Sequence, residues 1–238
     1  MGHPVKVIHR GSDWSEVESS DGYHGYIINH SLVPMTEAEM EQWRNSEREI
    51  VTSVYEVNVP GVTDLVNGNI LVAKGDTLVL PDGRRFARTE AVPTRPLAQQ
   101  PTFSYDSVPA IAARYLGLPY LWGGLSSKGM DCSGLVRMAY LAQGYLTVRD
   151  ACDQIKEGTP VALDSLRPGD LLYVGDRKTG RITHVAIYEG DGQFVHSSQL
   201  VRRNSLRPSS PAYLNYNIVG ARRLQGTALA SHPWYFNR

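Results

Sequence analysis

Short stretches in which apolar and polar residues alternate recur through the first 92 positions of the chain. This pattern is typical of strands that bury one face, and the Gly, Asp and Asn residues between the stretches are typical of turns. In the first part of the chain we expect strands at residues 5–8, 14–18 and 26–28, with a turn at Asp21-Gly22. We therefore predict a small all-β barrel over residues 1–35.

A helical pattern interrupts these strands at residues 36–44. Thr36 stands in the position of an N-cap, and Glu39 three residues later completes a capping box. Alternating stretches then return, with turn dipeptides between them, at residues 50–57, 69–73, 77–80 and 84–88. We predict a connecting helix within residues 36–48 and a second, shortened all-β barrel over residues 49–92.

The pattern changes after residue 92. Three prolines and few apolar residues between positions 93 and 101 indicate an extended linker, which we place at residues 93–106. Beyond the linker we expect helices at residues 107–116, from 132 to just before Gly144, and at 151–157, and strands at residues 171–174, 184–188, 193–196 and 217–222. Helices followed by an antiparallel sheet indicate an α+β domain, which we assign to residues 107–238.

The charge balance argues against several classes of partner. The chain has 24 basic and 24 acidic residues, so no electrostatic reason exists to expect binding to nucleic acid or to an anionic membrane. No apolar run approaches the ~20 residues that a transmembrane helix needs. Met1 is not followed by a secretory signal peptide, and we interpret this end of the chain as processed or trimmed.

Cys132 is the first residue of the expected helix that ends before Gly144. The free amides and the dipole at a helix N-terminus favour an anion, so this position is expected to lower the pKa of a thiol and to activate it as a nucleophile. Cys132 and Cys152 are the only cysteines. A nucleophilic thiol cannot stay in a disulfide, so we expect Cys152 to be free and packed on the short helix that follows residue 150.

Two histidines lie far downstream, His184 and His196, and a cysteine with separated histidines is the pattern of a thiol hydrolase. Both lie on expected strands that residues 189–192 join as a hairpin. Side chains alternate across a strand, so the two rings share a face only if the loop has an odd length or the hairpin contains a bulge. We predict one of these two features.

Six blocks of sequence occur in a fixed order: residues 120–124 (YLWGG), 131–134 (DCSG), 149–150 (RD), 166–171 (LRPGDL), 184–188 (HVAIY) and His196. With these blocks, residues 108–224 resemble the NlpC family of bacterial cell-wall cysteine peptidases. The resemblance implies a papain-like fold, in which helices pack on an antiparallel sheet. It also implies that the two preceding barrels are bacterial Src-homology-3-like modules.

The predicted mechanism uses four residues. Cys132 attacks an amide carbonyl, His184 accepts the thiol proton and later donates it to the leaving amine, and His196 orients the ring of His184. The backbone amide of Cys132 and, by resemblance, the hydroxyl of Tyr120 hold the oxyanion. The same cysteine and histidines could supply three zinc ligands, but no glutamate lies at metalloprotease spacing, so we expect no metal and no other cofactor.

The resemblance implies a γ-D-glutamyl-L-diamino-acid endopeptidase that acts on peptidoglycan-derived peptides with a free N-terminal L-Ala. Asp131, Ser133 and Asp150 would then bind the ammonium group and the adjacent backbone, although Asp131 also suits helix N-capping. Trp122 would contact substrate or pack under its loop. Further expectations are that Tyr23 or Tyr26 of the first barrel forms a wall of the pocket and that the chain is a monomer.

Two other interpretations stay open. The chain could be a cell-wall binding protein with an inert catalytic domain, although the presence of Cys132, His184 and His196 argues against it. It could also be an acyltransferase or an amidase on the same fold. The resemblance points to the bacterial cell envelope, and the lack of a signal peptide leaves recycling of wall fragments in the cytosol as a second possibility.

Overall fold

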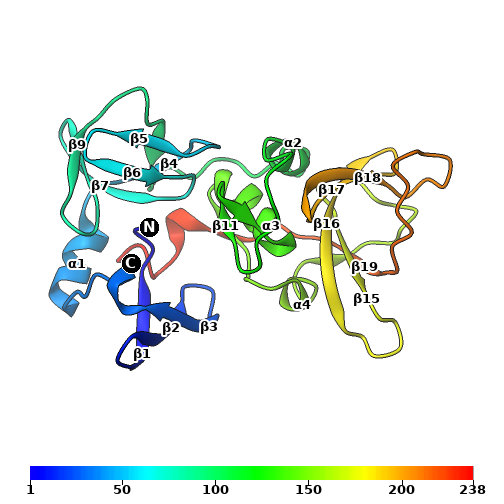
Figure 1. The fold of residues 1–238 in the computed structure, drawn as a ribbon, viewed down its shortest axis with the longest axis horizontal. Coiled ribbons are helices and arrows are strands. Elements are labelled where there is room, and N and C mark those ends of the chain that lie inside the picture. The colour runs from blue at the N-terminus through cyan, green and yellow to red at the C-terminus, as the bar shows by residue number, and fades with distance from the viewer. Residues whose placement is uncertain (238) are drawn as a thin grey trace. The chain divides into compact units, whose positions relative to one another are not determined.

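The structure of the protein is a computed structural model, and it describes residues 1–237. The chain forms two compact units, one of Met1–Gln100 together with residues 228–237, and the other of Pro101–Thr227. Each unit contains antiparallel sheets and few helices (Figure 1). The mixed α and β character expected from the sequence is therefore confirmed.

The first unit begins with a three-stranded antiparallel sheet in the order β1-β2-β3. Its strands are β1 (Val5–Arg10), β2 (Trp14–Ser19) and β3 (His24–Ile28), which confirms the three expected strands. Tyr23 precedes β3 and Tyr26 lies on it, with 43% and 70% of their surfaces exposed. Contact of either tyrosine with substrate stays a prediction.

A single helix, α1 (Glu37–Asn45), follows a short 3₁₀ turn at Asn29–Ser31. The Thr36 hydroxyl accepts a hydrogen bond from the Glu39 amide, and the Glu39 carboxylate accepts one from the Thr36 amide at 2.7 Å. These reciprocal bonds satisfy two amides that would otherwise be free at the helix start. The predicted capping box is confirmed.

The rest of the first unit is a five-stranded antiparallel sheet in the order β10-β4-β7-β8-β9, beside a small β5-β6 hairpin. The strands are β4 (Arg48–Val51), β5 (Val57–Val59), β6 (Val62–Leu65), β7 (Ile70–Lys74), β8 (Thr77–Val79), β9 (Arg85–Ala87) and β10 (Thr94–Pro96). Their buried core contains Val51, Val62, Leu65, Leu71, Leu78, Leu80, Phe86 and Val92. The division of residues 1–92 into two barrels of a known type stays a prediction.

The end of the chain belongs to the first unit, which differs from the predicted domain over residues 107–238. The buried Arg48 guanidinium donates to the carbonyl of Tyr235 at 2.6 Å and lies 4.7 Å over the ring of Phe236. Tyr235 is itself buried, and its hydroxyl bonds to His3 at 2.8 Å. A desolvated arginine needs such partners, and the C-terminal residues supply them.

The second unit places its helices before and beside one large sheet. The helices are α2 (Ser107–Ala113), α3 (Cys132–Ala142) and α4 (Ala151–Gln154), and the hairpin β11 (Leu125–Ser126) and β12 (Gly129–Met130) leads into α3. The six-stranded antiparallel sheet has the order β14-β19-β15-β16-β17-β18. Its strands are β14 (Thr159–Pro160), β15 (Leu171–Gly175), β16 (Ile182–Gly190), β17 (Gln193–Ser198), β18 (Leu200–Ser205) and β19 (Ile218–Arg223).

Helix α3 packs against β16 and β17 (Figure 1). Its apolar side chains are buried, and the hydroxyl of Tyr140 donates to the carbonyl of Leu224 at 2.6 Å. Gly144 follows the helix with a φ of 80°, a conformation that glycine adopts without strain. The helix that begins at Cys132 is thus packed against the sheet and ends at a glycine.

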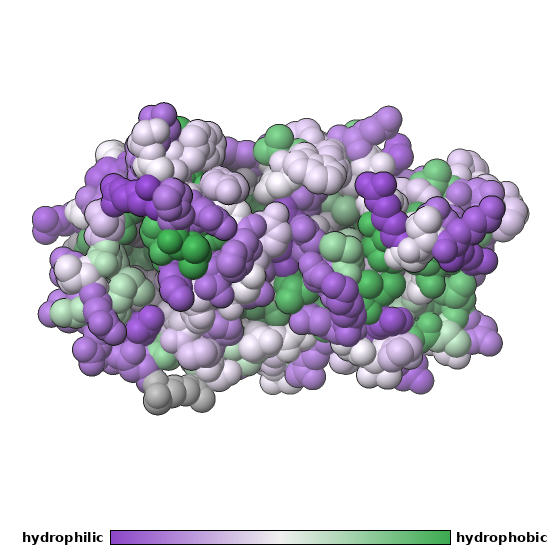
Figure 2. Space-filling model, turned by 90° about the horizontal axis from the view of Figure 1, so that it is seen from below, coloured by the Kyte–Doolittle hydropathy of each residue, from purple (hydrophilic) through white to green (hydrophobic). Residues whose placement is uncertain are grey.

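Short strands β13 (Tyr145–Leu146) and β20 (Thr227–Ala228), and a 3₁₀ turn at Leu229–Ser231, complete the described elements. Within residues 1–237, no helix combines the length and the apolar character needed to cross a bilayer. Hydrophilic residues are interspersed with hydrophobic areas on the face seen in Figure 2.

Asp170 connects three strands of the large sheet. Its carboxylate is fully buried and accepts two hydrogen bonds of 2.8 Å from Arg223 on β19, and a third from the amide of Arg167. Its backbone carbonyl accepts from the amide of Tyr188 on β16. Asp170 therefore holds the start of β15 to both neighbouring strands.

We expect Asp170→Ala to destabilise this sheet by about 3 kcal/mol, because it leaves an arginine and a backbone amide without their charged partner. Amide hydrogen exchange in β15 and β19 measures the effect, and a loss of about a hundredfold in protection is expected. Asp164→Ala is the matched control, since Asp164 is exposed and the hydrogen bond described for its side chain is with its neighbour Ser165. Equal protection in the two variants would contradict this role.

Candidate active site

Cys132 is the first residue of α3, directly after the N-cap Asp131. Oδ1 of Asp131 accepts a hydrogen bond of 2.7 Å from the amide of Gly134, so the side chain caps the helix. The half-buried thiol is free, and the backbone amide of Val185 on β16 hydrogen-bonds to its sulfur. Because Val185 follows His184, the helix start lies against the strand that carries the first histidine.

A second contact fixes the nucleophile beside the histidine strands. Ser197 is fully buried on β17 and donates to the carbonyl of Met130 at 2.6 Å. Ser197 follows His196, and Met130 lies two residues before Cys132. The segment that leads into α3 is therefore bound to the strand that carries the second histidine.

Burial raises the pKa of the Cys132 thiol above its ordinary value, and this effect outweighs the amides of Val185 and Ser133 that lower it. The negative charge of Asp131 raises the pKa further. The expectation of a lowered pKa at the helix start is therefore wrong for the resting enzyme, because desolvation penalises the thiolate more than the amides stabilise it. Such a thiol needs a neighbouring base to become a nucleophile.

The β16–β17 hairpin contains the bulge that the sequence requires. Ile187 pairs with Val195 and Tyr188 with Phe194, but the next pair is Gly190 with Gln193, so Glu189 is an extra residue. The loop has only the two residues Asp191 and Gly192, with φ values of 51° and 75°. A two-residue loop without the bulge would have placed the two histidines on opposite faces.

His184 and His196 lie on one face and contact each other. His184 Nε2 lies 2.8 Å from His196 Nδ1, and the ring centroids are 5.1 Å apart in an edge-on arrangement. The prediction of an odd loop or a bulge is confirmed. The structure thus brings together three of the predicted catalytic residues. The Val185 amide bonds to Cys132 next to His184, and the hydrogen bond between the imidazoles joins His184 to His196.

Both imidazoles are neutral at physiological pH. Burial lowers the pKa of His184 to about 3, and the charges of His196 and Arg202 lower it further. Burial also lowers the pKa of His196 to about 4, against the opposing effect of its hydrogen bond to Asn204. Neutral His184 is the form that can accept a proton from the thiol.

Two further residues in this cluster were missed by the sequence reasoning, Asn204 on β18 and Tyr216 before β19. Asn204 Oδ1 lies 3.0 Å from His196 Nε2, and the Tyr216 hydroxyl lies 3.1 Å from His196 Nδ1. The sequence analysis did not predict strand β18, so it could not predict the pairing of Asn204 with Phe194 on β17. Tyr216 lies in a loop whose path only the folded chain defines.

Tyr120 lies near the nucleophile. Its amide donates to the carbonyl of Gln199 at 2.8 Å, which holds its loop to the turn between β17 and β18. Burial raises the pKa of the Tyr120 hydroxyl, and the charges of Cys132 and Asp131 raise it further. The hydroxyl therefore stays protonated as a donor.

Trp122, two residues after Tyr120, is 87% exposed and does not pack under the loop.

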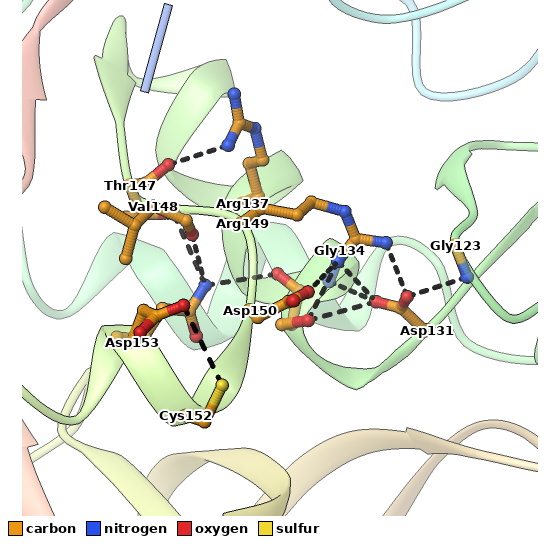
Figure 3. A network of polar contacts seen from close by, with 12 residues as sticks. Gly123, Asp131, Gly134, Arg137, Thr147, Val148, Arg149, Asp150, Cys152 and Asp153 are labelled. Atoms are coloured by element: carbon orange, nitrogen blue, oxygen red, sulfur yellow. Dashed lines mark hydrogen bonds and ion pairs between the residues drawn. The ribbon is translucent and has the colours of Figure 1, made fainter. Parts of the chain in front are cut away.

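Arg149 binds both neighbours of the nucleophile (Figure 3). Its guanidinium donates to the two carboxylate oxygens of Asp131 at 2.5 and 3.2 Å and to the hydroxyl of Ser133 at 2.9 Å. Asp131 also accepts a hydrogen bond from the amide of Gly123. Asp150 is placed differently, because its side chain is 44% exposed and its Oδ1 lies 3.7 Å from Arg149. Asp131 and Ser133 thus face into the protein, whereas Asp150 reaches solvent.

Cys152 is exposed on α4 rather than packed as expected. The helix is one turn long and buries Ala151 and Gln154 instead. The ligand atoms of Asp150, Cys152 and Asp153 lie within 4.8 Å of one another. In the described part of the chain, Cys132 and the two histidines do not bring three ligand atoms together at such spacing, so the geometry does not favour the zinc alternative.

The comparisons with known proteins agree with this geometry. Residues 117–223 match the NlpC/P60 family. The chain is 44% identical over 117 residues to a γ-D-glutamyl-L-lysine dipeptidyl-peptidase of Bacillus subtilis, and this match covers 48% of this chain and 38% of that enzyme. It is 30% identical over 240 residues to dipeptidyl-peptidase 6 of Lysinibacillus sphaericus, which covers 89% of this chain and 84% of that protein.

A solved structure extends the likeness to both units. The crystal structure of an NlpC/P60 family protein from Bacillus cereus matches with a TM-score of 0.78 and 26% identity, over 94% of this chain and 80% of that one. The thiol at a helix start, the paired imidazoles and these likenesses point to the same conclusion. The chain belongs to the NlpC/P60 family of cysteine peptidases.

Proposed function

We propose that the protein hydrolyses the bond between γ-D-Glu and the diamino acid in peptides derived from peptidoglycan. The observation that carries the proposal is the thiol at the start of α3, which lies against β16, where His184 forms a hydrogen-bonded pair of neutral imidazoles with His196 of β17. The name of the similar B. subtilis enzyme, γ-D-glutamyl-L-lysine dipeptidyl-peptidase, supports the substrate class.

The reaction runs in two stages. His184 takes the proton of Cys132 as the sulfur attacks the amide carbonyl, and the oxyanion accepts hydrogen bonds from the Cys132 amide and the Tyr120 hydroxyl. The imidazolium then donates its proton to the leaving amine, and a thioester remains. Water, deprotonated by the same imidazole, hydrolyses the thioester and restores the thiol. His196 holds the ring of His184 throughout.

Recognition of the substrate rests on Asp150 and Trp122. The carboxylate of Asp150 would bind the ammonium group of an N-terminal L-Ala, an interaction strengthened by charge, and its 44% exposure supports this role. Trp122 would supply an apolar surface for the substrate, a role that the exposure of its ring supports. Asp131 and Ser133, which Arg149 holds, act by positioning the helix start rather than by direct contact.

The setting of this activity is the bacterial cell wall. The similarity to an Escherichia coli protein named as a murein DD-endopeptidase supports action in the cell envelope. We also propose that residues 1–35 and 49–92 form Src-homology-3-like modules, which the three-stranded and five-stranded antiparallel sheets support.

The direct test compares two cysteines. Cys132→Ala should lower hydrolysis of L-Ala-γ-D-Glu-L-Lys and of the diaminopimelate analogue by at least ~10³-fold, because the nucleophile is lost. Cys152→Ala, which removes the exposed thiol, should hydrolyse both like the wild type. Mass spectrometry of the products measures the rates. Release of a sugar from a muropeptide, or retained activity in Cys132→Ala, would exclude this reaction.

The pH dependence tests the neutral imidazole pair. With the pKa of His184 at about 3 and that of His196 at about 4, both rings stay neutral as the pH falls from 7 to 5. We expect kcat/KM at pH 5 to lie within about threefold of its value at pH 7, whereas a base with the ordinary histidine pKa of about 6.5 would lose about 30-fold. The termini of the substrate do not titrate in this window. An acid limb centred near pH 6.5 would show that His184 is not buried as a neutral base.

Asp150→Asn tests recognition of the ammonium group. We expect KM for L-Ala-γ-D-Glu-L-Lys to rise about tenfold or more with kcat little changed, because a charge-assisted hydrogen bond is lost. The N-acetylated tripeptide is the control substrate, and the variant and the wild type should hydrolyse it equally poorly. Asp153→Asn, on the same short helix, controls for general effects on α4. Equal KM values for Asp150→Asn and the wild type would rule out this contact.

A further inference from the structure

Asn204 has an orientation that the fold decides. Its Nδ2 lies 2.9 Å from the carbonyl oxygen of Ala212, and its Oδ1 lies 3.0 Å from His196 Nε2. A carbonyl oxygen can only accept a hydrogen bond, so the NH₂ group of the amide must face Ala212. The oxygen of the amide therefore faces the imidazole, and the reverse orientation would set two acceptors against each other.

The carbonyl of Ala212 is itself held in place. It also accepts a hydrogen bond of 2.9 Å from the amide of Ser205, and the amide of Leu214 donates one of 2.9 Å to the carbonyl of Ser205. Ser205 is fully buried. The loop after β18 is therefore bound to the end of that strand, and it presents a fixed acceptor to Asn204.

The orientation of Asn204 determines which nitrogens carry protons in the neutral pair. An acceptor beside His196 Nε2 requires the proton on Nε2, so His196 Nδ1 carries the lone pair. His184 Nε2 lies 2.8 Å from this lone pair and must donate to it. The proton of His184 is then on Nε2, and its Nδ1 is left free to act as a base.

Tyr216 supports the same arrangement from a separate part of the chain. Its hydroxyl lies 3.1 Å from His196 Nδ1, and a hydroxyl can donate to that nitrogen only if the nitrogen is unprotonated. The side chain of Ser198 hydrogen-bonds to the same hydroxyl, and it can donate to the tyrosine oxygen while the tyrosine proton points to the imidazole. The ring of Tyr216 also packs edge-on against His184, with centroids 5.4 Å apart.

We propose that Asn204 is a positioning residue that sets the tautomer of both imidazoles. The carbonyl of Ala212 anchors its amide, and the Tyr216 hydroxyl is a second donor, besides His184, to Nδ1 of His196. The inference rests on the proposed function, in which Nδ1 of His184 accepts the thiol proton of Cys132. A neutral amide at the end of this chain fixes the tautomer without adding a negative charge. The imidazolium that forms during attack is therefore a strong acid, which suits transfer of its proton to the leaving amine.

The wild-type enzyme tests the proposal before any substitution. Nitrogen chemical shifts of histidine-labelled protein at pH 7 distinguish protonated from unprotonated ring nitrogens. We expect protonated Nε2 and unprotonated Nδ1 in both His184 and His196, each assigned with a His→Gln variant. A protonated Nδ1 in either ring would overturn the proposal, and this result does not depend on which peptide the enzyme cleaves.

Two variants then separate positioning from packing. Asn204→Leu keeps the size of the side chain but removes the acceptor, so both tautomers should appear in the spectra and kcat should fall about tenfold or more, with KM changed less than about threefold. Asn204→Asp keeps an oxygen toward His196 but loses the hydrogen bond to the Ala212 carbonyl, so it tests the acceptor apart from the anchor. It should restore the single tautomer and much of kcat, and it should move the acid limb of kcat/KM to higher pH, because a carboxylate stabilises the imidazolium.

Asn217→Leu is the control, because Asn217 also donates to a backbone carbonyl, that of Gly175, but has no contact with either histidine among its hydrogen bonds. It should keep the wild-type tautomer and kcat. A fall in kcat for Asn204→Leu without a change of tautomer would reduce Asn204 to a packing role and overturn the proposal, as would wild-type activity in that variant. The rate at which iodoacetamide alkylates Cys132 compares the same variants without a peptide substrate. A failure of the positioning role can therefore be told apart from a failure of the proposed function.

Discussion

The site depends on one hydrogen bond, the 2.8 Å contact between His184 Nε2 and His196 Nδ1. This contact requires the two side chains to emerge on one face of a hairpin whose loop has only two residues. The bulge at Glu189 supplies the shift by one position, and the side chain of Glu189 bonds across to Arg203 on β18 at 2.9 Å. A local irregularity of the sheet is thus a condition for catalysis.

Desolvation governs the chemistry of this pair and of the thiol. The helix start and the amide of Val185 favour a thiolate at Cys132, but burial penalises the charge more, and the same burial keeps both imidazoles neutral. The resting site therefore holds a thiol beside a neutral base rather than an ion pair. Charge develops only as the sulfur attacks, where the Cys132 amide and the Tyr120 hydroxyl are proposed to receive it.

Charged side chains serve chiefly as supports around this uncharged centre. Arg149 binds both neighbours of Cys132, and the pair of Asp170 with Arg223 holds β15 to β19. Ionic groups placed next to the reacting atoms, but bonded to each other, keep the helix start in position without supplying a counter-ion to the thiolate. Asp150 also pairs with Arg149, at 3.7 Å, but its side chain is 44% exposed and reaches solvent.

Local patterns in the sequence determined much of the architecture. The capping box at Thr36, the helix that begins at Cys132, the strands at His184 and His196, and the need for a bulge or an odd loop all follow from residues close together in the chain. These features depend on hydrogen bonds and side-chain alternation over a few residues, which a sequence records directly.

Only the tertiary structure decided the features that depend on distant residues. The contacts of Tyr216 with His196, of Arg149 with Asp131 and of Arg48 with Tyr235 join segments that are separated in the chain. The contact of Asn204 with His196 depends on the pairing of β17 with β18, and the raised pKa of Cys132 depends on its burial. Burial and long-range partners are properties of the folded chain. The sequence by itself determined which groups carry the chemistry, and the tertiary structure decided their protonation and orientation, because both depend on what packs against them.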